Sequence, residues 1–412
     1  MMRTLFILAL GISALGGQRL SAQNLADYLA IGRDSFPGLQ AIRQQLSAQS
    51  LSPDQVTGWK DPSVSVGVFP LPVETRLGPQ QAKLSIRQQF PWFGQQQAGK
   101  EVAESKIGLA TQAVNLETLE WSEQVKILWW EMIGNAELVA ILNARLDWLH
   151  QLEEVATQRL ETGNGSSIRV IEIQMEQSKL DKKLTDQRAH QVRLSQRFNL
   201  LLGRKLDAEI AYSDSLALPR ETFWENDWRD SMYRSHPGVA WFDARIQQLE
   251  AERNLIDRQR KPQLSAGLDY LLIGNRTDAD PLNNGRDALM LSGGLQIPVS
   301  GKQWRAKMEE KTLMARAQHL EQQALIDNLL GEALKSVETL NTLWRDWELN
   351  LSLDQQAQTL ESLMLDAYTR DGAEFEDLLD LENDRLEYQL RAWNARILWH
   401  AQLAHLEKLL GS

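Results

Sequence analysis

Hydrophobic and polar residues alternate in four short segments of the chain, two in each half. In the first segment Val64, Val66 and Val68 alternate with serine and glycine, and the same two-residue period returns in the other three. A period of two is typical of a β-strand with one apolar face. The sequence therefore predicts four strands, at about residues 62–73, 81–91, 262–273 and 287–299.

After the second strand of each half, the apolar residues recur every three or four positions instead. The first of these stretches, residues 94–161, contains no proline, and as a helix it would be about 100 Å long. The second covers about residues 301–369. This spacing predicts two long helices with coiled-coil seams. A turn follows each helix, at 161–167 and at 370–376, and leads into a return helix.

The two halves of the chain repeat one pattern. Residues 35–39 read SFPGL and residues 235–239 read SHPGV, and in each half a second proline follows at the same interval. Such a repeat predicts two copies of one structural unit. We expect a duplicated helix-strand-strand-long helix-turn-helix unit. Its parts are a first repeat at 23–203, a connector at 204–222 and a second repeat at 223–412.

The first 22 residues have the features of a secretory signal peptide. Arg3 precedes an apolar run, and small residues stand before the predicted cleavage site after Ala22. Beyond residues 1–22, no apolar run approaches the length of about 20 residues that a membrane-spanning helix needs. The chain contains no cysteine, which fits an exported protein without disulfides. We therefore expect a protein of the bacterial envelope.

Charge and residue types argue against several other classes of function. The net charge is -11 and no basic patch is interleaved with aromatic residues, so nucleic acid is not an expected partner. The six histidines form no metal-binding motif, and the sequence has neither a Ser-His-Asp order nor a nucleophile elbow. We expect no catalytic residue, no cofactor and no metal site, and hence no enzyme.

The four strands could belong to a soluble sheet or to a membrane β-barrel, because both show the same period. Three features favour the barrel: the predicted export signal, strand lengths of about 10 residues, and aromatic residues at the strand ends, Trp59, Phe90 and Trp92. Four strands alone would leave two unpaired edges in lipid. The barrel would therefore have to close with strands from other copies of the chain.

Several stretches of this pattern carry a resemblance to a known family. They are QFPWFGQ at 89–95, HPG at 236–238, KPQLSAGL at 261–268, IPVSGK at 297–302, and the tip stretches that begin at Gly163 and Gly372. In order, spacing and duplication they resemble the TolC-like outer-membrane efflux proteins, and among these the branch of heavy-metal efflux channels such as CusC. The resemblance covers nearly the whole chain after the signal peptide.

The resemblance implies a mainly α-helical protein with a membrane β-barrel part. A homotrimer would form a twelve-stranded barrel in contact with outer-membrane lipid, and its helices would continue as a periplasmic α-helical barrel. This barrel would taper to a closed iris at the two turns, where a periplasmic adaptor and an inner-membrane pump dock. The implied function is a passive exit duct of a tripartite efflux or type I secretion system. The cargo stays open among heavy-metal cations, drugs and peptides.

Acidic residues gather at the second turn and at the helix start that follows it. Asp371, Asp377 and Asp380 are the candidates for a pore gate, because the resemblance implies rings of carboxylates at the closed iris. Three copies of a carboxylate at a constriction would attract cations. The alternative interpretation is an ordinary solvated helix start, where acidic side chains suit the positive end of the helix dipole.

Small residues occupy the turns and are the candidates for contact with the adaptor. They are Gly163, Gly165, Ser166, Ser167 and Gly372. In the implied assembly, the turns are the part of the chain that faces the pump. A plain helix-helix turn with an N-capping serine accounts for the same residues.

A soluble periplasmic coiled-coil adaptor or scaffold protein is the alternative from another class. In such a protein the four strands would form a small soluble sheet. Adaptors usually begin with one membrane anchor and carry a lipoyl-like β-domain between two helices, and this sequence predicts neither. A scaffold would stay in solution without detergent, which distinguishes it from a membrane duct.

Overall fold

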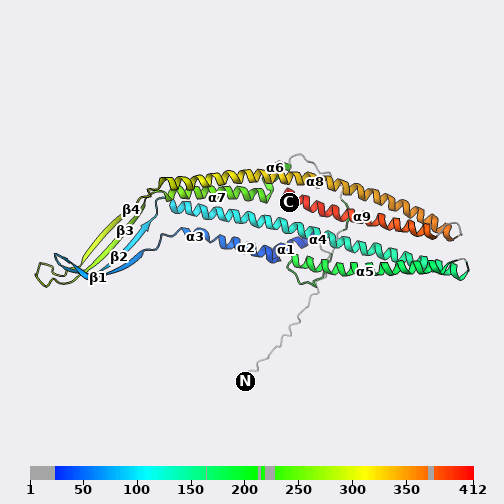
Figure 1. Ribbon diagram of the computed structural model, residues 1–412, viewed down its shortest axis with the longest axis horizontal. Helices are drawn as coiled ribbons and strands as arrows, with labels where there is room; N and C mark the ends of the chain where they lie inside the picture. Colours follow the sequence, from blue (N-terminus) through cyan, green and yellow to red (C-terminus); the bar gives the residue numbers. More distant parts are fainter. Residues whose placement is uncertain (1–23, 164, 212–214, 219–227, 370–374) are drawn as a thin grey trace, which may run out of the picture. The chain divides into compact units, whose positions relative to one another are not determined.

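A computed structural model describes residues 24–163, 165–211, 215–218, 228–369 and 375–412. Along the chain they form α1 (Leu25–Ser35), α2 (Pro37–Gln49), α3 (Ser52–Val56), β1 (Ser63–Thr75), β2 (Gly78–Phe90), α4 (Gln95–Glu161), α5 (Ser167–Leu201), α6 (Trp228–Ser235), α7 (Pro237–Gln259), β3 (Gln263–Ile273), β4 (Ala288–Gln296), α8 (Gly301–Thr369) and α9 (Phe375–Leu410) (Figure 1). The described chain is thus mainly helical with one small sheet, as predicted. The predicted signal peptide at 1–22 lies outside the described residues, and the connector at 204–222 lies partly outside them.

The chain forms two compact units, which we describe separately. Unit 1 consists of Met1–Phe36, Val125–Pro219 and Asp346–Leu398. Unit 2 consists of Pro37–Gln124, Arg220–Arg345 and Trp399–Ser412. Each unit takes segments from both halves of the sequence, and the long helices α4 and α8 contribute to both. The units therefore differ from the two predicted repeats, whose boundaries stay a prediction.

The four strands of unit 2 form one antiparallel sheet with the order β1-β2-β3-β4 (Figure 1). Within the described residues, β1 and β4 are its edges. The register aligns Val66, Leu84, Tyr270 and Leu289 across the sheet. Side chains alternate between the two faces along a strand, so these four residues share one face. The next row lies on the other face and contains Ser65, Ser85, Asp269 and Met290.

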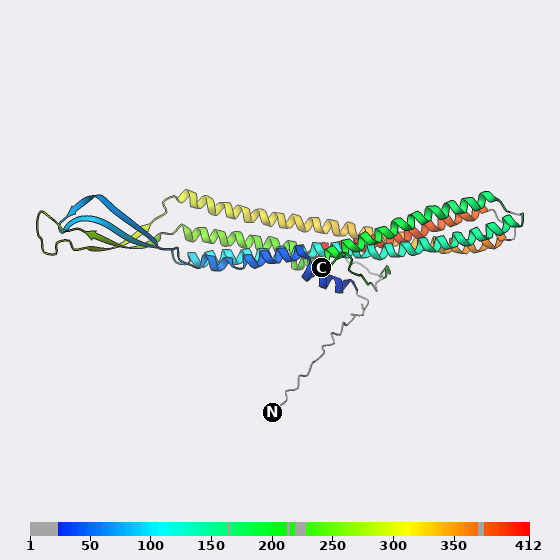
Figure 2. The same cartoon turned by 90° about the horizontal axis from the view of Figure 1, so that it is seen from below.

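Polar side chains join α7 to the first part of α8 in unit 2. The side-chain amide of Gln322 is buried and donates to the carbonyl of Val239 at 3.1 Å and to the carboxylate of Asp243 at 2.7 Å. Lys311 forms an ion pair with Glu252 at 2.7 Å. These two helices therefore run side by side, as both ribbon views show (Figure 2).

Apolar residues of the long helices form the core of unit 1. The buried cluster consists of Leu138, Leu142, Leu149, Leu152, Ala156, Ile173, Leu180, Leu184 and Leu378. They come from α4, α5 and α9, and on α4 they follow the three-to-four spacing of an amphipathic helix. Burying one leucine side chain contributes roughly 1.5–3 kcal/mol. This apolar face is thus the main attraction between the three helices.

An aromatic cluster fixes α1 to the rest of unit 1. The rings of Tyr28 on α1, Trp129 on α4 and Phe198 on α5 have centroids 5.3 to 5.5 Å apart. The Tyr28 hydroxyl donates to the carbonyl of Ala211 at 3.1 Å. Aromatic pairs of this kind contribute about 0.5–1.5 kcal/mol beyond the burial of their area, so α1 is held by both packing and a hydrogen bond.

Gly203, just after α5, occupies a position that suits only glycine. Its φ is +64°, in the left-handed region that favours glycine. A Cβ at this residue would lie 2.2 Å from the carbonyl oxygen of Ser35. The Ser35 hydroxyl itself donates to the carbonyl of Leu202 at 2.7 Å. The end of α1 and the end of α5 therefore meet with no room for a side chain.

Gly203→Ala should destabilise unit 1 by more than about 1 kcal/mol, because a left-handed alanine alone costs roughly that much and the clash adds to it. The measurement is thermal unfolding followed by circular dichroism. Gly108→Ala, in the part of α4 that belongs to unit 2, is the control, since a Cβ there would meet nothing within 4 Å. The control should leave the unfolding temperature unchanged or raise it. Equal effects of the two substitutions would contradict this account.

Candidate functional site

The tip of unit 1, which we define as residues 160–176 and 375–380, contains most of the predicted site residues. Gly163 has a φ of +79°, and a Cβ on Gly165 would lie 2.4 Å from the backbone nitrogen of Leu160. Both glycines are therefore required by the turn itself. Asp371 and Gly372, which were predicted for the second turn, lie outside the described residues.

Ser166 caps α5, and Ser167 begins it. The Ser166 hydroxyl accepts a hydrogen bond from the N–H of Ile168 at 3.2 Å, as an N-capping serine does. Both serines are exposed. The turn chemistry thus accounts for Gly163, Gly165 and Ser166 locally, and contact of the tip with an adaptor stays a prediction.

Asp377 and Asp380 lie on the outer side of α9. Both are exposed, whereas Leu378 between them is fully buried in the core of unit 1. The two carboxylates therefore point away from the core, as the helical spacing predicts. Their position agrees with a solvated helix start and equally with a carboxylate ring in an assembly, so their role as a gate stays a prediction.

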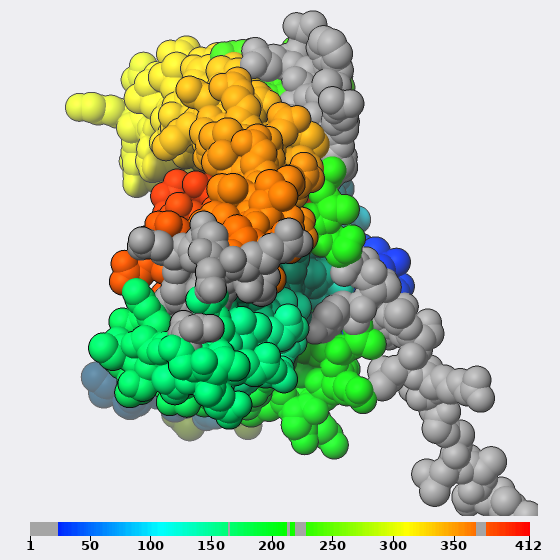
Figure 3. Space-filling model, turned by 90° about the vertical axis from the view of Figure 1, so that its right-hand side faces the viewer, coloured from blue at the N-terminus to red at the C-terminus, as the bar shows by residue number. Residues whose placement is uncertain are grey.

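An ion pair brings the start of α5 beside the start of α9. Arg169 lies 2.8 Å from Glu376 on α9 and 3.3 Å from Glu172 on its own helix. The hydrogen bond to Glu376 raises the pKa of Arg169. Figure 3 looks onto this end of unit 1, where the α4–α5 pair is green and the α8–α9 pair is orange.

Three exposed apolar residues form a stripe on α5 at the tip. Ile168, Ile171 and Met175 are 64%, 55% and 55% exposed, and their three-to-four spacing puts them on one face of the helix. We call them the tip stripe. Our interpretation of the sequence concentrated on the glycines and serines of the turn and missed this stripe, although the spacing of its members is visible in the sequence.

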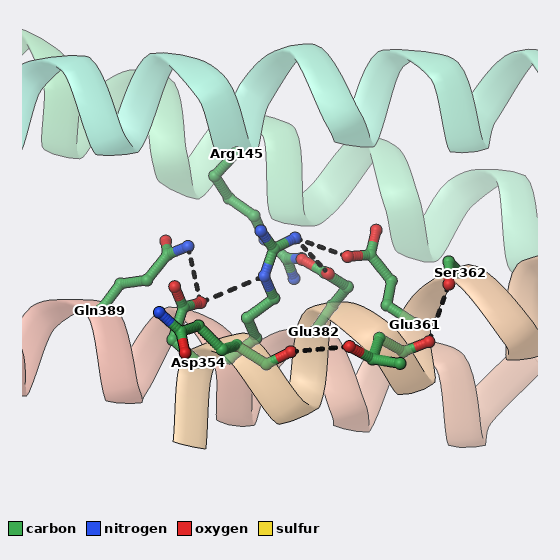
Figure 4. A network of polar contacts seen from close by, with 9 residues as sticks. Arg145, Asp354, Glu361, Ser362, Glu382 and Gln389 are labelled. Carbon is green, nitrogen blue, oxygen red and sulfur yellow. Dashed lines mark hydrogen bonds and ion pairs between the residues drawn. The ribbon is translucent and has the colours of Figure 1, made fainter. Parts of the chain in front are cut away.

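A buried ion pair joins α4 to α9 deeper in unit 1 (Figure 4). Arg145 and Glu382 are 2.5 Å apart, and their side chains are only 6% and 5% exposed. Arg145 also donates to the side chain of Asn383 at 3.0 Å and lies over the ring of Trp148. Removing one partner of such a buried pair would leave an uncompensated charge, which costs roughly 3–5 kcal/mol.

Arg385 extends this pair to α8. It lies 2.5 Å from Glu361, 3.2 Å from Asp354 and 3.2 Å from Glu382. With Arg145, these residues form what we call the buried charge network, which contains two arginines and three carboxylates. The carboxylates outnumber the arginines, so one negative charge in this network has no full partner.

The environment of Glu361 disfavours its ionised form. Burial, followed by the nearby Glu382, raises the pKa of Glu361 to about 7. Arg385 and Trp148 also face it and act in the opposite direction. Burial likewise lowers the pKa of Arg145. The sequence analysis did not identify this network.

Among the described residues, no group of three or more histidine, aspartate or glutamate residues could hold a metal ion. No described helix is both long and apolar enough to span a membrane.

Comparisons with known proteins give one consistent result. No protein-family model and no curated protein sequence matches the chain. Among solved structures, CusC matches with a TM-score of 0.75 and 10% identity, over 95% of this chain and 92% of that one. The outer membrane protein VceC of Vibrio cholerae matches with 0.73 and 14%, over 94% and 96%. The CmeC outer membrane channel of Campylobacter jejuni matches with 0.71 and 11%, over 99% and 94%.

These similarities extend over nearly the full length of both chains, while the identities are low. They show that the chain has the fold of outer-membrane efflux channels. The predicted resemblance to the TolC-like proteins is thus confirmed at the level of the fold.

Glu361→Gln should change how the stability of unit 1 depends on pH. A carboxyl whose pKa is raised in the folded state stabilises the fold below its unfolded value of about 4.5, and this contribution is lost as pH rises to about 7. The loss amounts to roughly 1–3 kcal/mol. The variant should therefore gain stability relative to the original chain between pH 5 and pH 8, measured by thermal unfolding. Glu348→Gln, an exposed site on α8, is the control, and parallel pH curves for Glu361→Gln and the original chain would refute the proposed shift.

Proposed function

We propose that this chain, which has the fold of the TolC-like efflux channels, forms a passive exit duct in the bacterial outer membrane. Three copies would assemble into one channel, served by a periplasmic adaptor and an inner-membrane pump. One observation carries the proposal: the sheet of unit 2 has an apolar face that no described residue covers, together with two unpaired edges.

The apolar face extends over all four strands. Exposed fractions include 70% for Val66 on β1, 43% for Ile86 on β2, 38% for Leu268 on β3 and 83% for Leu291 on β4. A continuous exposed apolar surface of this kind marks an interaction site or a membrane surface. Strands of 9 to 13 residues suit a tilted passage through a bilayer core of about 30 Å. Lipid is thus the environment that we propose for this face.

The two edges require further strands. In lipid, every backbone N–H and C=O group needs a partner, so an open sheet edge is not tolerated. If β4 of one copy pairs with β1 of the next, three copies close a twelve-stranded barrel without edges. The polar face then points into the lumen, where water can solvate it. The same arrangement would place the helices of three copies around one periplasmic conduit.

Asp377 and Asp380 would lie around the periplasmic entrance of this duct, with the predicted Asp371. Unit 1 exposes both carboxylates near the tip turns, and rings of three would favour cations at a narrow opening. The buried charge network would tie the α8–α9 pair to α4 within each copy. If opening of the entrance moved the α8–α9 pair away from α4, the ion pairs of the network would have to break.

The proposal predicts an outer-membrane trimer with a length of roughly 100 Å or more. The chain would be expressed with its N-terminal segment, the membranes fractionated, and the detergent-solubilised particle imaged by electron microscopy. Recovery of the chain in the outer-membrane fraction as a trimer is the expected result. A monomer that stays in solution after the envelope is broken would refute the duct and favour a periplasmic scaffold.

We further propose that the adaptor contacts the tip stripe and the residues predicted for the two turns, Gly163, Gly165, Ser166, Ser167 and Gly372. A photo-crosslinking residue at Ser167 should capture a periplasmic adaptor in the native host, identified by mass spectrometry. Ile171→Asp should abolish this capture, because a carboxylate would replace an exposed apolar contact.

Val192→Asp is the matched control for Ile171→Asp. Val192 lies on the same helix and is 57% exposed, and its substitution should leave capture unchanged. Crosslinks only to another copy of the chain would contradict adaptor contact at this surface, as would an equal loss in the two variants.

A further inference from the structure

Short residues make up most of the polar face of the sheet. They are Ser63, Ser65 and Gly67 on β1, Ser265 and Gly267 on β3, and Ser292 and Gly294 on β4. Side chains this small project little from the backbone. The few long side chains of the same face therefore determine its electrostatic character.

Lys83 and Arg87 on β2 are the basic residues of this face. The register places Arg87 between Ser63 on β1 and Gly267 on β3. A Cβ on Gly267 would lie 3.6 Å from Nε of Arg87, so the arginine side chain lies beside this glycine on the neighbouring strand. Arg87 is exposed, and its charge is open to solvent on the polar face.

Asp269 is the acidic residue of this part of the face, and its charge is already matched. It forms an ion pair with Lys83 at 3.0 Å and accepts a hydrogen bond from Ser85. Its side chain is only 3% exposed. No carboxylate of the described residues forms an ion pair with Arg87. The central rows of the face therefore carry one net positive charge per chain, at Arg87.

We infer that Arg87, beside the paired charges of Lys83 and Asp269, makes the lumen of the barrel selective for anionic solutes. This inference rests on the proposed function, because a lumen exists only when several sheets close. In the trimer, three arginines would line the wall at one level, with serine and glycine between them. Like charges repel across water over distances of a Debye length, which is about 10 Å in 0.1 M salt and about 30 Å in 0.01 M salt. The class of cargo that this wall suits is the small organic or inorganic anion, and free metal cations would be disfavoured at this level.

The chain contains no cysteine, which allows a direct test in intact cells. Ser292→Cys introduces one thiol on the polar face, in the same row as Arg87 and two strands away. An anionic and a cationic methanethiosulfonate are added outside the cells in about 0.01 M salt, and the rate of reaction of each with Ser292→Cys is measured. Each rate is divided by the rate at which the same reagent reacts with a free thiol in solution. The ratio of the two reports the local potential and does not depend on opening of the tip.

The anionic reagent should react faster with Ser292→Cys. Adding Arg87→Gln should lower the anion-to-cation ratio roughly fourfold, the change expected for one charge about 10 Å away in water. Arg87→Lys should retain the ratio, because it keeps the charge. Higher salt should reduce the difference between the Gln and Lys variants. A ratio that Arg87→Gln leaves unchanged would overturn the inference, and so would a failure of both reagents to reach Ser292→Cys.

Leu291→Cys separates failure of this inference from failure of the proposed function. Leu291 is next in sequence and lies on the apolar face, so in a membrane barrel its thiol would face lipid and react with neither reagent. If Leu291→Cys reacts as fast as Ser292→Cys, the sheet is not the wall of a barrel and the proposed duct fails. If only Ser292→Cys reacts, the barrel stands and the effect of Arg87 decides the selectivity.

Discussion

Backbone hydrogen bonding at the edges of the sheet is the constraint on which the rest of this structure depends. β1 and β4 each have one row of N–H and C=O groups without a partner strand among the described residues, and the sheet presents an uncovered apolar face. Water can hydrogen-bond to the open edges, but exposing the apolar face to water is unfavourable. Lipid solvates the apolar face, but it leaves the backbone groups of the open edges without hydrogen-bond partners. Closure with other copies in a membrane would satisfy both demands, and this is the physical basis of the proposed oligomer.

In unit 1, burial determines which charged side chains need a partner. Arg145 and Glu382 are buried and Arg385 is partly buried among long helices, where a charge is stable only when its partners are held at hydrogen-bonding distance. Asp377 and Asp380 lie at the exposed start of α9 and need no partner. The network fixes how α4, α8 and α9 meet, and the exposed carboxylates would be free to act on solutes in the proposed duct. Burial thus separates the paired charges of the network from the proposed gate charges along one helix.

Residue periodicity predicted the elements well because each period has a direct geometric cause. The alternation around Val66 reflects the two faces of a strand, and the spacing of Leu142 and Leu149 reflects one face of a helix. Periodicity gave no information about which distant segments pack together. The contact of Tyr28 with Trp129 and Phe198 and the division into two units therefore emerged only from the structure. Arg145 lies on the same helical face as Leu142 and Leu149, and this apolar context was the available signal for a buried charge.

The charges proposed to act on solutes have opposite signs, with carboxylates at the tip of unit 1 and Arg87 on the sheet of unit 2, and in a duct they would act on different steps. Carboxylates at the tip would raise the local concentration of cations near the entrance, whereas Arg87 on the sheet would oppose their passage through the barrel. A passive channel gains nothing from binding its cargo tightly at every level, because tight binding slows release. Opposite fields in sequence would keep the residence of any one class of ion short. The pump would then select among anionic cargoes, and Arg87 would also oppose the return of cations.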